Sequence, residues 1–251
     1  METETIGGVS FKDVIAFQTR ILFGNQYGRI MKEDSTQDDL LIACLRIGWN
    51  DAFRHVSVNK KDGNESVLEK KSKEWKKNHK GEWEDYISDI ILKGKVLGFF
   101  QKYAETNSTD EKIQVIQDAL DNDEFKNVFL SVKESVCFGH IQKLFNMAIK
   151  FYLCLYFCAE HLNISKKFDN KIIANLKYAD CPIDSIILSK IAEKTAEKRF
   201  SNYKWSKFGA DDSDNPTEAY KEIQETIRNL VDDTQSNLYF DFTAWNSQDA
   251  Q

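Results

Sequence analysis

Residues that interrupt regular structure are scarce in this chain. Among its 251 residues there are two prolines and 11 glycines, whereas a sandwich or barrel of many short strands needs frequent turns. Long helices need few such breakers. Hydrophobic residues make up 41% of the sequence and aromatic residues 12%, which is enough for a large packed core. We therefore expect an all-α protein.

The cysteines lack the close spacing of a metal or disulfide framework. There are five and no CxxC pair, at Cys44, Cys137, Cys154, Cys158 and Cys181. Structural zinc and iron–sulfur sites favour tightly spaced ligands, and no charged start followed by an apolar run resembles a signal peptide. We expect buried, reduced thiols, a cytoplasmic location and no metal.

Long hydrophobic runs and excess positive charge are also missing. The longest apolar stretch, residues 144–159, is interrupted by Asn146 and Lys150 and is shorter than the ~20 residues of a bilayer span, so no membrane partner is expected. With 34 Lys and Arg against 40 Asp and Glu, the formal net charge is −6. This balance excludes a polybasic protein that binds nucleic acid through overall charge, but it allows a local basic surface.

One local basic segment exists between Lys70 and Lys80, where six lysines surround Trp75. It fits a solvated helix face or loop. It also fits a basic strip with an aromatic platform, which could follow a nucleic-acid backbone and stack a base.

The apolar spacing and the capping residues predict about ten helices. Ser108 and Glu111 match a capping box, and Asn215 with Pro216 matches a helix start. The connection 166–178 has room for a further short helix. The predicted helices span residues 11–22, 37–49, 83–103, 108–120, 124–133, 141–161, 182–198, 215–232 and 236–246.

Chemistry is most readily placed in the segment 138–150 and at Asp184. Lys143 and Lys150 are seven residues apart and project from one side of the same helix, with Asn146 between them. Lys143 falls in the first turn, where the helix dipole and neighbouring apolar residues could favour a neutral, nucleophilic amine. Asp184, near the start of an apolar helix, could cap that helix or stabilise a developing positive charge. From the residues alone, a surface helix and a structural cap are the competing interpretations.

These features together resemble the helix-hairpin-helix DNA glycosylases. The likeness spans roughly residues 138–188: a short turn ending in Gly139, a helix with a lysine near its start and another seven residues on, and a later Pro-x-Asp segment. It is most similar to the archaeal 8-oxoguanine DNA glycosylase branch. The resemblance implies a two-lobed, helical helix-hairpin-helix fold in which Lys143 attacks the sugar carbon and Asp184 assists.

The same resemblance supplies further site residues. It implies a base pocket that includes Lys150, and around it we expect Gln142, Asn146 and Trp205, with Trp245 as a stacking wall. Gly139 and His140 are expected at the DNA backbone. The expected partner is double-stranded DNA bearing a modified base, bound by a monomer without metal or organic cofactor.

The expected reaction flips the target nucleotide and expels its base, through an imine on Lys143 or through a water oriented by Asp184. Met147 stands where the resemblance leads us to expect an aromatic residue, and the chain between Lys143 and Asp184 is long. A bulky base, such as the glucosylated hydroxymethylcytosine of phage DNA, is therefore as good a hypothesis as 8-oxoguanine, and would imply anti-phage defence.

Two other classes compete with this prediction. In a non-catalytic helical module that binds nucleic acid or protein, Lys143 and Asp184 would lie apart in solvent, whereas an enzyme brings them together. Adjacent acidic pairs such as Asp211-Asp212 are interpreted as solvated surface rather than as nuclease ligands, because neighbours on a helix face different directions. We expect lobes over residues 10–120 and 121–200, with returning helices over 201–251 and a cleft between the lobes.

Overall fold

The computed structural model describes residues 5–6, 9–53, 92–125, 136–205 and 215–246. Within these ranges the regular secondary structure is helical apart from one short hairpin, in which β1 (Thr5–Ile6) pairs antiparallel with β2 (Val9–Ser10). The all-α expectation is confirmed for this part of the chain, and the hairpin is an addition that the residue pattern did not predict. The predicted helix 124–133 and the lysine strip 70–80 lie almost wholly or wholly outside the described residues.

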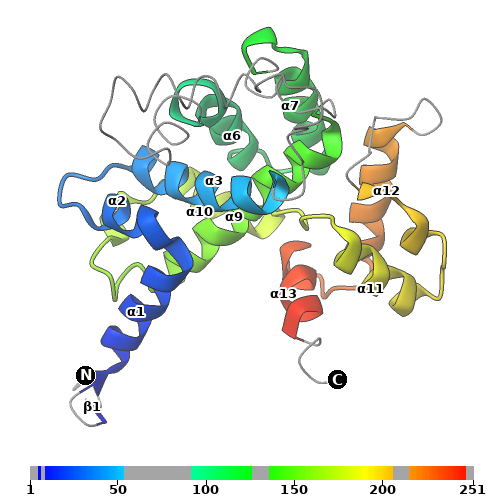
Figure 1. Cartoon of the computed structure of the whole chain (residues 1–251). Helices are drawn as coiled ribbons and strands as arrows, with labels where there is room; N and C mark the ends of the chain where they lie inside the picture. The colour runs from blue at the N-terminus through cyan, green and yellow to red at the C-terminus, as the bar shows by residue number, and fades with distance from the viewer. Residues whose placement is uncertain (1–4, 7–8, 54–91, 126–135, 206–214, 247–251) are drawn as a thin grey trace, which may run out of the picture.

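The order of the elements is visible in Figure 1. In the described part of the chain, four short 3₁₀ turns lie between helices, at Gly24–Gln26, Ser165–Lys167, Leu176–Tyr178 and Phe200–Asn202. The helices are α1 (Phe11–Phe23), α2 (Tyr27–Met31), α3 (Gln37–Phe53), α6 (Leu97–Ala104), α7 (Thr109–Asp121), α9 (Phe138–Cys158), α10 (Asn170–Asn175), α11 (Ser185–Thr195), α12 (Pro216–Arg228) and α13 (Leu238–Asn246).

Helices α3 and α9 pack along each other at the centre of the molecule, with α6 and α7 on one side and α11 to α13 on another (Figure 1). Gly48 permits their close approach: a Cβ added there would lie 2.7 Å from the carbonyl oxygen of Leu144. One cluster of buried apolar side chains draws residues from all three expected segments of the chain. The central pair therefore brings together helices from the two segments expected to form packed lobes.

Several predicted helix boundaries are confirmed by their caps. Ser108 accepts a hydrogen bond from the amide of Glu111 at the start of α7, and Asn215 accepts one from the amide of Thr217 at the start of α12. The Glu111 carboxylate accepts its hydrogen bond from the amide of Asn107 rather than from Ser108. Helix α1 ends at Phe23, and the Gly24 that follows it has a φ of 51°, in the region that glycine tolerates best.

Two predicted boundaries around the site are wrong. Helix α9 begins at Phe138 rather than Ile141, because the carbonyl of Cys137 already accepts the amides of His140 and Ile141. Helix α11 begins at Ser185 rather than around Pro182, because Asp184 caps it. The first shift places Lys143 in the second turn of α9, and the second makes Asp184 the residue that caps α11.

A buried polar network connects α9 to α6 and α12. The Asn146 amide accepts a hydrogen bond from the Tyr103 hydroxyl at 2.6 Å and donates one to the Tyr220 hydroxyl at 2.9 Å. Tyr220 in turn donates to Asp180 at 3.1 Å. Burial raises the pKa of both tyrosines well above the ordinary value, so their hydroxyls remain protonated donors. In the part of the chain that is described, no helix is long and apolar enough to cross a membrane.

Candidate active site

The centre of the site is the ammonium group of Lys143, in the second turn of α9. Its Nζ lies 2.9 Å from Oδ2 of Asp51 at the end of α3 and 3.3 Å from Oδ2 of Asp184. The Lys143 side chain is only 8% exposed, and those of Asp51 and Asp184 are 21% and 13% exposed. The lysine and aspartate singled out from the sequence therefore converge in a largely desolvated place, 41 residues apart in the chain.

Asp184 uses its two carboxylate oxygens for different contacts. Oδ1 accepts the amides of Ile186 and Ile187 at 2.9 and 3.0 Å and so caps α11, while Oδ2 faces Lys143. The cap fixes the carboxylate in position, because its rotation would break both amide bonds. Asp184 is thus a helix cap and, through its second oxygen, a partner of Lys143.

Aromatic rings cover the lysine. The Lys143 ammonium lies 4.8 Å from the centre of the Trp205 ring, within cation–π distance. The His140 ring, one turn before Lys143, makes an edge contact with Trp205 and stacks on Phe53 with centroids 5.7 Å apart. These rings exclude water and strengthen the electrostatic interactions around the ammonium.

The charge balance of this group is uneven. Two carboxylates surround one ammonium, so the three side chains together carry one net negative charge when all are ionised. A positive charge that develops beside them would be stabilised.

Asp51 was not among the residues predicted from the sequence. It lies seven residues after Cys44 and four after Ile47 on α3, so it shares their helix face. Cys44 and Ile47 belong to the apolar face, and Asp51 is an acid on that same face. That spacing was the available signal. What the sequence could not supply is that α3 packs against α9 and brings this acid to Lys143.

Gln142 and Asn146 lie in the interior, with no exposed surface. The Gln142 side chain donates to the carbonyl of Ile183 and accepts from its amide, at 2.9 and 3.1 Å. Asn146 holds the tyrosine network together. The side-chain amides of Gln142 and Asn146 therefore form hydrogen bonds within the protein. Those of Gln142 position the segment before Asp184, and those of Asn146 link three helices.

Lys150 forms a second, separate ion pair. It contacts the carboxylate of Asp241 on α13, and its ammonium lies 5.1 Å from the Phe242 ring and 6.0 Å from the Trp245 ring. Burial raises the pKa of Asp241, although Lys150 opposes the shift. The structure therefore places Lys150 and Trp245 together at α13, whereas Trp205 lies at Lys143.

Gly139 and His140 are buried in the first turn of α9. His140 Nδ1 lies 3.1 Å from the Cys137 Sγ and accepts a hydrogen bond from the Cys137 backbone amide at 3.4 Å. The histidine expected at a DNA backbone thus closes the start of the helix and contributes a ring to the aromatic cover of Lys143.

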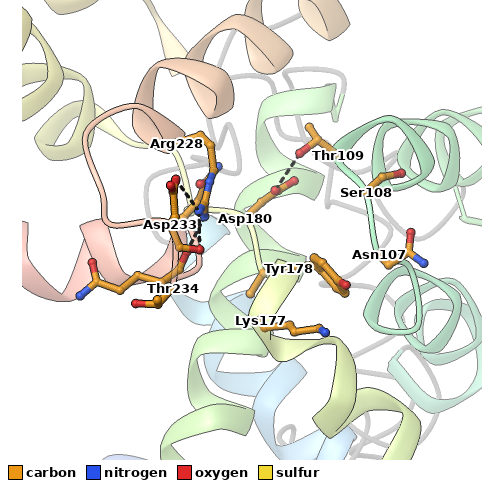
Figure 2. Close-up of a pocket in the computed structure, with 12 residues that line it drawn as sticks. Asn107, Ser108, Thr109, Lys177, Tyr178, Asp180, Arg228, Asp233 and Thr234 are labelled. Carbon is orange, nitrogen blue, oxygen red and sulfur yellow. Dashed lines mark hydrogen bonds and ion pairs between the residues drawn. The ribbon is translucent and has the colours of Figure 1, made fainter.

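A pocket of about 540 Å³ lies away from the lysine site (Figure 2). It opens between the start of α7, the segment 177–180 and the connection from α12 to α13. Thr109 donates to Asp180 at 2.9 Å, and Arg228 donates to backbone carbonyls of the α12–α13 connection, including that of Asp233 at 2.9 Å. Its polar groups largely serve local structure, and Lys143, Asp51 and Asp184 are not among its lining residues.

The described residues contain no group of three or more His, Cys, Asp or Glu side chains arranged to hold a metal ion. Cys44 and Cys181 are fully buried, and burial raises the pKa of both thiols well above the ordinary value. All five cysteines are free of disulfide bonds.

No family model, no curated protein and no solved structure matches this chain. Its function must therefore be argued from the site itself.

Proposed function

We propose that the protein is a DNA glycosylase that excises a modified base, with Lys143 as nucleophile and Asp51 and Asp184 as its two acid partners. The observation that carries the proposal is the largely buried Asp51–Lys143–Asp184 group, with contacts of 2.9 and 3.3 Å. A module in which these residues are surface charges would leave them apart in solvent, so their convergence supports the enzyme. The described helices would form part of a two-lobed helix-hairpin-helix frame.

The first step is the release of the amine. A lysine must lose a proton before it can attack, and Asp51 is the nearer of the two carboxylates and the more exposed. We assign Asp51 as the group that takes the proton when a substrate binds. The proton moves from Nζ to Oδ2, which leaves a neutral amine beside a neutral acid.

In the second step one bond forms and one bond breaks. The Nζ lone pair attacks the sugar carbon C1′, the glycosidic bond breaks, and the base leaves with the bonding electron pair and a proton that Asp51 can return. Positive charge develops on the sugar as the base departs. Asp184, fixed by its contacts with the α11 amides, stabilises this charge. The attached nitrogen, now cationic, then gives a proton to Asp51, and its lone pair expels the ring oxygen, which takes that proton. The result is an open-chain sugar joined to Lys143 by a cationic imine, which Asp184 also stabilises.

The net negative charge of the group suits this chemistry. An oxocarbenium-like transition state and a protonated imine are both cations, so the Asp184 carboxylate, joined by Asp51 once it has returned its proton to the base, stabilises them more than it stabilises the neutral substrate. Trp205 keeps the ammonium out of water before reaction. The phosphates must be held elsewhere on the surface.

The proposal has two versions, which differ in the substrate. In one the substrate is 8-oxoguanine. In the other it is a bulky base such as glucosylated hydroxymethylcytosine, which would give a defence activity. The test measures abasic sites on unmodified DNA, 8-oxoguanine DNA and glucosylated phage DNA. It compares the wild type with Lys143→Arg, which keeps the charge but cannot deprotonate. Lys112→Arg is the matched control, because Lys112 is another buried lysine paired with a carboxylate, at 3.6 Å from Asp180.

The proposal expects abasic sites on one modified DNA for the wild type and for Lys112→Arg, with at least a ~100-fold loss in Lys143→Arg. Retained activity in Lys143→Arg, with loss in Asp184→Asn, would move the chemistry to a water oriented by Asp184. No product on any of the three DNAs from folded protein would favour the binding module.

A further inference from the structure

Helix α1 carries two apolar faces, and only one of them is buried. Ile15, Ala16, Thr19 and Phe23 face the body of the protein. Five other apolar side chains along the helix are 41 to 67% exposed. We call them the α1 stripe: Phe11, Val14, Phe17, Ile21 and Leu22.

The α1 stripe is large for a surface without a function. If a large apolar side chain carries ~150–250 Å², the stripe leaves roughly 500 Å² exposed, at the upper end of what monomers show. The patch also continues beyond the helix. The Phe11 ring contacts His161 at 5.2 Å, and Phe157, one turn before His161, is the most exposed large apolar residue described.

The charges beside the stripe favour a protein surface over a membrane. A helix that lies on a membrane usually has a polar face rich in lysine and arginine. Helix α1 has only Lys12 and Arg20 as cations, and Asp13 as an anion. Hydrogen bonds from the Ser10 side chain and backbone lower the pKa of Asp13, which keeps it charged at neutral pH.

The position of these charges points to a second copy of the same chain. Asp13 and Arg20 are seven residues apart and lie on the same flank of the α1 stripe, beside Phe17. In a two-fold symmetric, antiparallel pair of α1 helices, the same flank of each copy meets the other. Asp13 of one copy then lies opposite Arg20 of the second copy, and the reverse pair forms by symmetry.

The same register aligns the apolar residues. With a rise of 1.5 Å per residue, placing Asp13 opposite Arg20 also places Phe11 opposite Leu22. It brings the two Phe17 side chains together at the two-fold axis. Two stripes would bury about 1,000 Å² in total, the lower limit for a specific interface.

We propose that the protein forms a homodimer through antiparallel pairing of the α1 stripe. This inference is independent of the glycosylase proposal and replaces the expectation of a monomer. An interface of this size predicts dissociation at low concentration, with the mass falling from twice 29.1 kDa to 29.1 kDa.

The test uses sedimentation velocity of the full chain over a range of micromolar concentrations. The wild type is expected to dimerise, and Phe17→Asp, which places two carboxylates at the axis, is expected to stay monomeric with unchanged circular dichroism. Asp13→Arg and Arg20→Asp should each fail to dimerise, since each creates two like-charge contacts. Mixed in equal amounts, these two variants should form a heterodimer, because both contacts again join opposite charges.

The mixing experiment distinguishes self-association from a stripe that is covered in another way. A stripe that binds a different protein gives a monomeric wild type and no heterodimer. A stripe covered by another segment of the same chain gives a monomer whose melting temperature falls in Phe17→Asp. Either result, or a wild-type dimer that survives Phe17→Asp, would overturn the proposal.

Discussion

At the scale of single residues, the site depends on side chains that serve structure and chemistry together. Asp184 caps α11 through one oxygen and faces Lys143 through the other. Because asparagine is as good a helix cap as aspartate, Asp184→Asn can separate the two roles.

We predict that Asp184→Asn slows base release by about 100-fold or more, since it removes a charge aimed at the developing cation. The melting temperature should change little, because the amide oxygen still caps the helix. The measurement is a single-turnover rate on the DNA that the wild type cleaves. Asp169→Asn is the matched control, because Asp169 caps α10 through the amides of Lys171 and Ile172. Equal losses in both variants would reduce Asp184 to a cap.

The sequence predicted those parts of the site that depend on the position of a residue within its own helix. A lysine in an early turn and an acid at a helix start are visible in the sequence, and Lys143 and Asp184 do meet. Gln142 and Asn146 were expected in a base pocket, Asn146 because it shares a helix side with Lys143. A sequence does not show which groups lie opposite, and here these are the backbone of Ile183 and two tyrosines.

At the scale of elements, the distance between α3 and α9 sets the position of Asp51 relative to Lys143. Gly48 is the point of closest approach, against the backbone of Leu144. The start of α9 also matters, because its three-residue shift from the predicted start puts Lys143 in the second turn. That shift follows from Cys137 and His140 closing the helix, a pairing that capping rules based on Ser, Thr, Asp and Asn do not anticipate.

We predict that Gly48→Ala lowers the free energy of unfolding by about 1–3 kcal/mol, because the added methyl group forces the two helices apart. Urea unfolding followed by circular dichroism measures the change. Gly98→Ala is the control: Gly98 lies in α6, and an added Cβ meets nothing within 4 Å. This control should be neutral or stabilising by up to about 1 kcal/mol. If both variants unfold at the same urea concentration, the close approach is not important for stability.

At the scale of the whole molecule, buried tyrosines connect helices that are distant in sequence. Tyr103, Tyr152 and Tyr220 are fully buried, and burial raises the pKa of each phenol well above its ordinary value. A group whose pKa is raised by folding contributes stability that is complete below the unfolded pKa and is lost as the pH rises towards the folded one.

We predict that the free energy of unfolding falls steeply above about pH 10, the ordinary tyrosine pKa. Three such groups give a slope of about 4 kcal/mol per pH unit, since one pKa unit is about 1.4 kcal/mol. Phenolate absorbance and helical circular dichroism should therefore change together as pH rises. Full titration of the tyrosines in a protein that remains helical would contradict the prediction.

The class of the fold could be predicted from composition, since scarce breakers and helical spacing both indicate helices. The arrangement could not. The site is built by a contact between Lys143 on α9 and Asp184 just before α11, which are 41 residues apart in the chain. A second contact joins Lys143 to Asp51 at the end of α3. Local periodicity identifies which face of a helix is apolar, but not which helix covers it, as the exposed α1 stripe illustrates.

The most direct test of the central claim is to trap the covalent intermediate on Lys143. The protein is incubated with the modified DNA in the presence of borohydride, which reduces an imine to a stable amine, and the cross-linked peptide is identified by mass spectrometry. The account predicts one adduct, on Lys143, that is absent in Lys143→Arg and present in Lys112→Arg. Base release by the wild type without an adduct at Lys143, or an adduct on a different lysine, would contradict it.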